Sequence, residues 1–199
     1  MYDHVVITGR EHRQAHHPID PIFLDRWSPR AMSGESISQA ELEPLFEAAR
    51  WAPSAGNQQP WRMLYAHRDT PSWELFYELL NPGNKTWCAN AAVLVLFISR
   101  TVNPEGRPIK THSYDTGAAW ENFALQGTRS GLVVHGMQGF NYDLARETLG
   151  IPAEFAVEAM AAVGRPGRKE HLSESLQARE FPSVRRPLAE TIIEGRYQE

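Results

Sequence analysis

The sequence predicts an α+β or mixed α/β sandwich, in which helices cover a small sheet. Helical segments outnumber strand segments and the two alternate along the chain, as in layered folds that combine helices with a sheet. The apolar run at residues 91–98 is continuous, as in a strand covered on both faces. With 199 residues, of which 42% are hydrophobic, the chain can bury one sizeable core. We expect a single domain over residues 18–199, preceded by a flexible polar arm at residues 1–17.

The clearest predicted helix begins at Ser38 and ends before Pro53. Ser38 and Glu41 have the S-x-x-E spacing of a capping box, in which side chains satisfy the first free backbone N–H groups. Apolar residues then recur at helical spacing on one face, at Leu42, Leu45, Phe46 and Ala49. Pro44 removes one hydrogen bond within this segment, so we expect a small kink there.

The other elements follow from hydrophobic periodicity and turn residues. Helices are expected at residues 18–26, 72–80, 114–129 and from 141 or 142 to 149, and strands at residues 62–67, 91–98, 132–139 and 155–163. Gly131 and Gly150 are expected to end the helices that precede them. Residues 81–84 read as a turn. The tail at residues 165–199 reads mainly as loop that ends in a short helix.

Composition and charge exclude several classes of protein. The net charge of −4 argues against general nucleic-acid binding, because attraction to phosphates requires a basic face. Charges of both signs are spread along the chain, so no polybasic membrane anchor is indicated. The longest apolar run is too short to span a bilayer. The first residues are polar and charged, unlike a signal peptide. We therefore expect a cytoplasmic protein that binds neither nucleic acid nor membrane.

The lone cysteine and the histidine-rich arm each allow two interpretations. Cys88 could be a nucleophile, but it precedes the apolar run, which favours a buried and inert thiol. His12 and His16 could form an i, i+4 metal pair if the arm were helical, with His17 beside them. Their order does not match the H-E-x-x-H zinc motif. We therefore expect a solvated arm and no metal site.

No familiar catalytic motif is present, but several loops could bind an anionic, aromatic ligand. Arg26 and Ser28 offer a cation and a hydroxyl to a phosphate, and Arg185 and Arg186 could join them. The stretch RWAPSAGNQQPW, residues 50–61, carries more hydrogen-bonding groups than a turn requires.

Within that stretch, Ser54, Asn57 and Gln58 offer donors and acceptors to a pyrimidine-like edge. HGMQGF, residues 135–140, has two glycines where backbone N–H groups could approach a ligand. Each feature also has an ordinary explanation: Arg26 could pair with Asp25 or Asp20, the other arginines could be solvated, and the glycines could serve turns.

Taken together, these features resemble the nitroreductase family of FMN-dependent oxidoreductases. Five blocks carry the resemblance in the family's order: DRWSPRAMS (25–33), LEPLFEAARWAPSAGNQQPWRM (42–63), DTGAAWENFALQGTRSGL (115–132), HGMQGF (135–140) and RRPL (185–188). The resemblance implies an α+β three-layer sandwich with a central, mostly antiparallel sheet flanked by helices. It also implies an intertwined homodimer with one FMN at each of two interface sites.

The resemblance assigns roles to particular residues. Arg26, Trp27 and Ser28 would meet the FMN phosphate and ribityl chain, with Arg185 or Arg186 completing the phosphate site. Arg30 would lie near N1 and O2 of the flavin. The partner subunit would contribute Pro53, Ser54 and Asn57. The segment Met137, Gln138 and Gly139 would lie beside the ring, with the backbone N–H groups of Gln138 and Gly139 at N5.

The family activity implied is hydride transfer from NADH or NADPH through FMN to nitroaromatic, quinone or similar acceptors, with ping-pong kinetics. The sequence departs from the family pattern at Gln138, which is commonly Glu, and at Ala55, where a second serine is common. The resemblance also offers Asn84 and Lys85 as further flavin contacts, although they lie in a stretch that aligns poorly with the family. Two alternatives remain: a related flavoenzyme reaction, such as reductive dehalogenation or oxygen-dependent flavin chemistry, and a non-catalytic FMN-binding protein.

Overall fold

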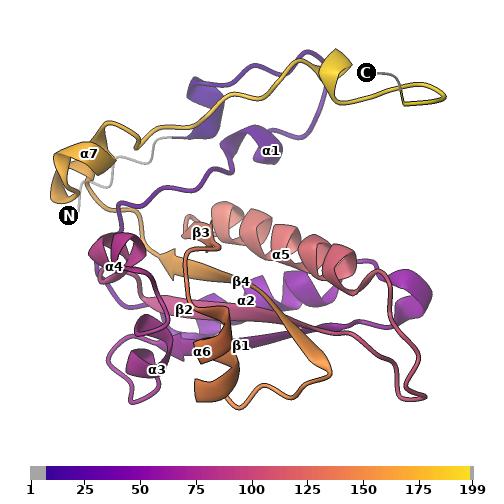
Figure 1. Cartoon of the computed structure of the whole chain (residues 1–199). Helices are drawn as coiled ribbons and strands as arrows, with labels where there is room; N and C mark the ends of the chain where they lie inside the picture. Colours follow the sequence, from indigo (N-terminus) through magenta and orange to yellow (C-terminus); the bar gives the residue numbers. More distant parts are fainter. Residues whose placement is uncertain (1–7, 198–199) are drawn as a thin grey trace.

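A computed structural model describes residues 8–197 and contains one four-stranded sheet (Figure 1). Its strands are β1 (Trp61–His67), β2 (Val93–Arg100), β3 (Val133–Met137) and β4 (Phe155–Gly164). They lie in the order β1-β2-β4-β3, and every neighbouring pair is antiparallel. The central position of β2 explains why its first seven residues are all buried. The four predicted strands are confirmed.

Helices cover both faces of this sheet and produce three layers. Alternate residues of β2 enter two different apolar clusters: Val93, Val95 and Phe97 enter one, and Leu94, Leu96 and Ile98 the other. The first cluster includes buried residues of α2 (Gln39–Arg50) and α5 (His112–Arg129). The second includes residues of α3 (Trp73–Tyr77), α4 (Pro82–Cys88) and α6 (Tyr142–Thr148). The α+β three-layer sandwich is therefore confirmed.

The ends of the two long helices form as their sequences predict. Ser38 and Glu41 form the reciprocal capping box, and α2 continues through Pro44 to Arg50. After α5, Gly131 has a φ of +71°, and the N–H of Leu132 donates to the carbonyl of Gly127 at 2.9 Å. A methyl group at Gly127 would lie 2.4 Å from Cγ2 of Val134, so the small residues of α5 allow close contact with β3.

Some boundaries differ from the predicted ones for local reasons. α1 covers only Ile22–Asp25, because Pro21 is its N-cap and the preceding residues stay outside the helix. The expected turn at residues 81–84 instead opens α4, with Asn81 capping the N–H of Asn84 and Pro82 at the first helical position. The tail is mainly loop, as predicted. Its short helical elements are η3 (Lys169–His171), α7 (Glu174–Gln177) and η4 (Leu188–Glu190).

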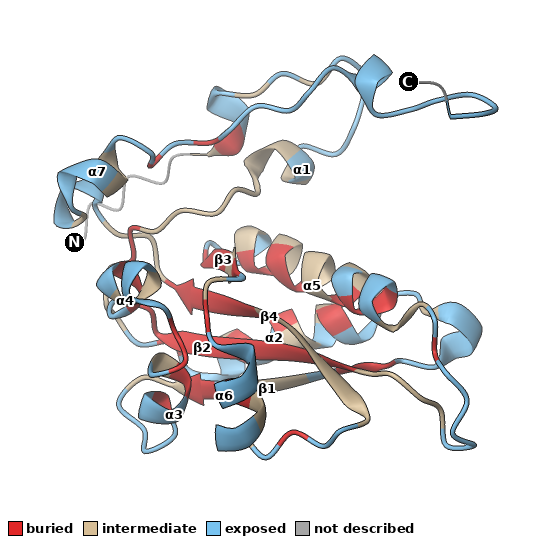
Figure 2. Ribbon diagram, viewed as in Figure 1, coloured by how far each residue is buried: buried red, intermediate tan, exposed pale blue. Residues whose placement is uncertain are grey.

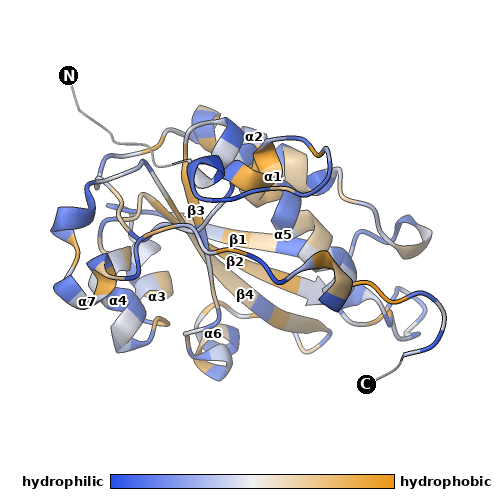
Figure 3. Cartoon of the chain, turned by 90° about the horizontal axis from the view of Figure 1, so that it is seen from above, coloured by the Kyte–Doolittle hydropathy of each residue, from blue (hydrophilic) through white to orange (hydrophobic). Residues whose placement is uncertain are grey.

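The two terminal segments lie side by side on the outside of the sandwich, with α1 against α5. Residues 8–25, with η1 (Gly9–Glu11) and α1, run beside the tail (Figures 1 and 2). Large apolar side chains of the tail are exposed, including Phe181, Val184 and Ile192, and apolar stretches continue toward its end (Figure 3). Within residues 8–197, no helix is long and apolar enough to cross a membrane.

Candidate functional site

The loop after α1, residues 26–31, is held by three side chains from distant parts of the chain. Arg13 Nη1 donates to the carbonyls of Leu24 at 3.0 Å and Arg26 at 2.6 Å. His135, on β3, places Nδ1 2.9 Å from the carbonyl oxygen of Pro29. Since a carbonyl only accepts hydrogen bonds, this nitrogen carries the proton.

Burial, opposed by the hydrogen bond to Pro29 and assisted by the charge of Arg30, lowers the pKa of His135 to about 4. The ring is therefore neutral at pH 7. It packs against Trp87, with 4.5 Å between the ring centroids. A neutral, buried histidine thus fixes the position of the loop without adding charge beside it.

Glu180, from the tail, holds the other end of the loop. Its Oε1 accepts hydrogen bonds from the backbone N–H groups of Arg30 at 2.6 Å and Ala31 at 2.8 Å. Its Oε2 is 3.8 Å from Nη1 of Arg30, and the residue is only 4% exposed. A buried carboxylate therefore fixes both the backbone and the charge of Arg30.

Positive charge gathers at the start of the same loop. Burial lowers the pKa of the Arg13 guanidinium, and the positive charges of Arg185 and Arg26 lower it further. Arg26 Nε lies 3.4 Å from Oε1 of Glu121 on α5, yet this buried nitrogen has no hydrogen-bond partner in the described chain. Arg26 does not form the ion pair with Asp25 that was one interpretation of the sequence, because Asp25 pairs with Arg10. The structure thus brings Arg26 and Arg185 into one cationic group.

The end of β3 is fixed by the segment that joins α3 to α4. The carbonyl of Gly139 accepts hydrogen bonds from the N–H of Asn81 and from Nδ2 of Asn84, both at 3.0 Å. A methyl group at Gly139 would lie 2.5 Å from Nδ2 of Asn81, so a larger residue there would have to displace that side chain. The N–H groups of Gln138 and Gly139 donate no hydrogen bond to other residues in the range 8–197.

A cavity of about 440 Å³ lies between the 26–31 loop, the end of β3 and α5. Three predicted site residues line it: Ser28, Met137 and Gln138. From α5 it receives Thr116 and Trp120, whose Oγ1 and Nε1 atoms are buried without a partner among the described residues. Unsatisfied buried polar groups cost free energy, so this cavity is suited to a ligand that pairs with them.

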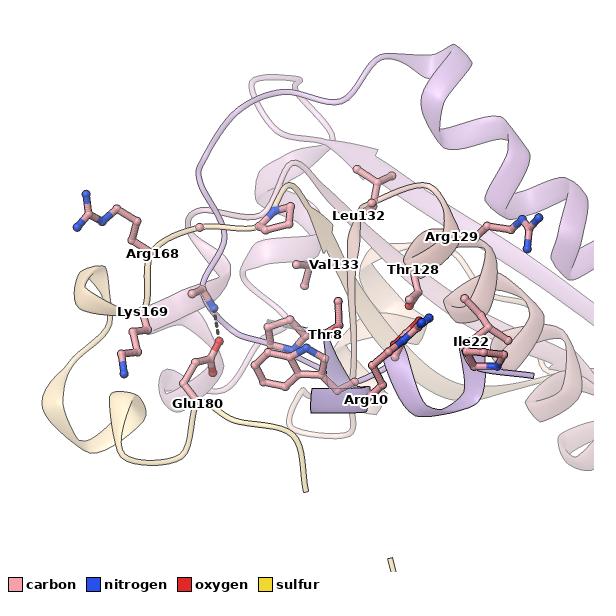
Figure 4. A pocket seen from close by; sticks show the side chains of 18 of the residues that line it. Thr8, Arg10, Ile22, Thr128, Arg129, Leu132, Val133, Arg168, Lys169 and Glu180 are labelled. Atoms are coloured by element: carbon pink, nitrogen blue, oxygen red, sulfur yellow. Dashed lines mark hydrogen bonds and ion pairs between the residues drawn. The ribbon is translucent and has the colours of Figure 1, made fainter. Parts of the chain in front are cut away.

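A larger cavity, of about 830 Å³, lies on the other side of the same loop. Figure 4 shows Arg10 and Ile22 on one wall and Arg168, Lys169 and Glu180 on another. Trp27 is the one predicted site residue that lines it. Most of its charged side chains come from the terminal segments. The smaller cavity therefore matches the predicted chemistry better, although it has half the volume.

The polar loop after α2 lines neither cavity. Pro53 and Asn57 are exposed and Ser54 is half-buried, while Ser54 Oγ accepts the N–H of Gln59 at 3.0 Å. Asn57 and Gln59 have positive φ angles, and such strain in residues other than glycine is common at functional sites. Trp51 is 72% exposed, whereas the tryptophan that ends the loop is buried.

Other singled-out residues also have definite environments. Cys88 is buried 3.5 Å from the Met137 sulfur, and burial raises the pKa of its thiol, so the expectation of a buried thiol is confirmed. Lys85, named above as a further flavin contact, pairs with Glu78 at 2.6 Å. Arg186 is exposed. No group of three or more potential metal ligands occurs between residues 8 and 197.

Several site residues had no signal in the sequence. Arg13 and Glu180 act through backbone groups far away in the chain, which spacing cannot reveal. Thr116 and Trp120 are four residues apart on one helical face, so the sequence could predict that they lie close together. It could not predict that their polar atoms have no hydrogen-bond partner among the described residues.

Comparison with known proteins places these features in a family. A sequence profile of the Nitroreductase family matches residues 24–80. A protein of Archaeoglobus fulgidus named NADH dehydrogenase/NAD(P)H nitroreductase is 29% identical over 149 residues, which cover 73% of this chain and 83% of that protein.

Solved structures extend the likeness over nearly the whole chain. One, described as an oxidoreductase containing FMN, is 47% identical, has a TM-score of 0.92, and covers 96% of this chain and 99% of its own. Another, named a nitroreductase in complex with FMN, from Desulfovibrio desulfuricans, is 25% identical with a TM-score of 0.71, covering 92% of this chain and all of its own. The chain belongs to the nitroreductase family.

Proposed function

We propose that this protein is an FMN-dependent oxidoreductase that takes hydride from NADH or NADPH and passes it to a nitroaromatic, quinone or similar small-molecule acceptor. The observation that carries the proposal is a set of groups, in and beside the 440 Å³ cavity, that have no hydrogen-bond partner among residues 8–197: Arg26 Nε, Thr116 Oγ1, Trp120 Nε1 and the N–H groups of Gln138 and Gly139. The relatives named above as NAD(P)H nitroreductases or as containing FMN support it.

The residues present fit this cofactor. Arg26, with Ser28 beside it and Arg185 in the same cationic group, would bind the phosphate through charge-assisted hydrogen bonds. Trp27 would lie along the ribityl chain. Arg186 would reach the phosphate only after the exposed tail rearranges.

Hydride transfer also fits the groups near the cavity. FMN, when bound, supplies the redox chemistry by accepting and returning hydride at N5. Arg30, fixed by Glu180, would favour the negative charge that develops at N1 and O2 on reduction. The N–H groups of Gln138 and Gly139 would orient N5, while Met137 packs beside them. The nicotinamide and the acceptor would use the cavity in turn, which gives ping-pong kinetics.

The proposal includes a homodimer in the cytoplasm. Trp51, Tyr114 and Phe181 are large apolar residues that one copy leaves exposed, and such surfaces commonly mark contacts with another chain. Pro53, Ser54 and Asn57 line no cavity in one copy, so they would reach the FMN bound to a second copy. Size-exclusion chromatography with light scattering checks this: a monomer that retains FMN would contradict the shared site.

The absorption spectrum of the purified protein is the first test. We expect flavin absorbance that is bleached anaerobically by NADH or NADPH and restored by nitrofurazone or menadione. A yellow protein that neither nicotinamide bleaches would indicate a non-catalytic flavin binder. Reoxidation by oxygen alone would indicate a different flavin reaction, and a colourless protein after incubation with FMN would refute the proposal.

Arg26→Ala tests the phosphate site. Removing a charge-assisted hydrogen bond costs about 1.5–3 kcal/mol, so FMN should bind about 10- to 150-fold more weakly in a fluorescence titration. Arg50→Ala is a matched control, because Arg50 forms an exposed pair with Glu47. Equal FMN affinity in the Arg26 variant and the control would refute the phosphate assignment.

A further inference from the structure

One wall of the 440 Å³ cavity contains a carboxylate that no predicted role uses. Glu158 lies in β4 where the pairing with β2 changes register: Phe97 pairs with Ala159, and Ile98 pairs with Val157. Glu158 is thus the additional residue of a β-bulge, a feature that turns a side chain out of the regular alternation and is frequent next to active sites. Here it brings Glu158 into the cavity lining.

Three side chains hold this carboxylate through one oxygen. Oε1 of Glu158 accepts a hydrogen bond from Ser99 Oγ, which is fully buried, and another from Ser113 Oγ at 2.7 Å. The same oxygen is 3.3 Å from Nδ1 of His112, which also lies 2.7 Å from Ser99 Oγ. Because Ser99 donates to Glu158, its oxygen is free to accept from a protonated Nδ1. The carboxylate therefore has a fixed position.

The second oxygen, Oε2, makes no hydrogen bond or ion pair within residues 8–197, and no lysine or arginine there pairs with Glu158. The rest of the lining includes Phe97, Met137 and Trp120, which suit a flat aromatic group. Thr116 Oγ1, 2% exposed and without a hydrogen-bond partner among residues 8–197, adds a buried polar group to the same lining.

We propose that Glu158 is a specificity-determining residue that selects aromatic electron acceptors carrying a cationic or hydrogen-bond-donating substituent, and disfavours those carrying a carboxylate. That these ligands act as electron acceptors rests on the proposed function, whereas the charge preference depends only on the residues that line the cavity. The apolar wall packs against the ring, and Oε2 accepts the hydrogen bond of the substituent. An anionic substituent would instead meet a fixed like charge at short range.

Matched ligands of opposite charge provide the test. Isothermal titration of the FMN-saturated protein should give a dissociation constant for benzamidine at least about 10-fold lower than for benzoate, since a hydrogen bond between charged groups gives about this gain. In Glu158→Gln, which keeps the side-chain shape, this preference should fall to near unity. Glu154→Gln, the same change outside the cavity lining, should keep it.

Turnover gives a second measurement on the same proteins. The ratio of kcat/KM for p-nitrobenzylamine to that for p-nitrobenzoate should fall at least about 10-fold in Glu158→Gln, whereas Glu154→Gln should keep the wild-type ratio. Equal affinity for benzamidine and benzoate in the wild type, or a preference that survives Glu158→Gln, would overturn the inference.

Flavin absorbance in the same samples separates this inference from the proposed function. If the protein takes up no FMN, the proposed function fails, and the two titrations on the cofactor-free protein still decide the charge preference. If FMN binds and is reduced but neither ligand is preferred, only the role of Glu158 fails.

Discussion

The sandwich and the terminal segments of this protein are held together by different forces. In the sandwich, β2 supplies alternate apolar side chains to two clusters, and Leu42 and Leu45 of α2 are fully buried. The terminal segments contribute few buried apolar residues. They are held instead by Arg10 on Asp25, by Arg13 on backbone carbonyls, and by Glu180 on the N–H groups of the 26–31 loop.

This difference separates stability from binding. Apolar burial is roughly proportional to area and tolerates small displacements, whereas a hydrogen bond to a loop fixes its position closely. The sandwich should therefore set the free energy of unfolding, and the polar contacts of the terminal segments should set the geometry of the FMN site. Variants in one region should leave the property of the other nearly unchanged.

The largest expected effect lies in the sandwich. Leu45→Ala removes a fully buried side chain from the cluster between α2, α5 and the sheet. Such substitutions lower the free energy of unfolding by about 2–5 kcal/mol, measured by denaturant titration. FMN affinity of the folded variant should match the wild type. A large loss of affinity without a loss of stability would show that the two regions are not separable.

His135 connects the regions, and its effect depends on pH. Its pKa is about 4 in the folded protein and about 6.5 in the unfolded chain, so between these values the unfolded chain binds more protons. The free energy of unfolding should therefore fall as pH decreases from 6.5 to 4, by up to about 3 kcal/mol from this group.

His135→Gln isolates that contribution, because the amide can still donate to Pro29 but does not titrate. The wild type should be the more stable protein at pH 7, and its advantage should shrink as the pH is lowered toward 4. Parallel stability curves for the two proteins would exclude His135 as the titrating group.

Glu180→Ala should affect binding more than stability. The N–H groups of Arg30 and Ala31 lose their acceptor, at a cost of about 1–3 kcal/mol. We expect much of this cost as weaker FMN binding in a fluorescence titration, with a small change in Tm. Glu180→Gln keeps an acceptor oxygen and should recover most of the affinity. A fall in Tm with normal FMN affinity would assign Glu180 to the fold alone.

The two regions also differ in how far the sequence predicts them. The strands, α2 and α5 follow from local patterns: the apolar run of β2, the capping box at Ser38 and the glycine after α5. The start of α4 was also local, since Asn81 and Pro82 are cap residues, but the same letters fit a turn. Local pattern thus explains most of the sandwich.

The site residues could be predicted only where they belong to sequence motifs of the family. Arg26, Ser28 and Gln138 come from the family blocks, and the structure brings the last two to one cavity. Glu158 could not be found, because the bulge depends on the register between two strands. Glu180 acts across about 150 residues of chain on backbone groups, which leave no trace in side-chain spacing.

The smallest expected effect tests the sandwich at its surface. Ser38→Ala removes the side-chain acceptor for the N–H of Glu41 and should lower the free energy of unfolding by about 1 kcal/mol. Glu41 has its pKa lowered to about 2, first by the backbone N–H of Ser38, then by its hydroxyl and by Arg165. The hydrogen bond from the backbone N–H remains in the variant. The decrease in the free energy of unfolding at low pH that Glu41 causes should therefore be smaller in the variant but still measurable. Because α2 lines neither cavity, FMN affinity should stay at the wild-type value, and a change there would mean that the helix transmits strain to the site.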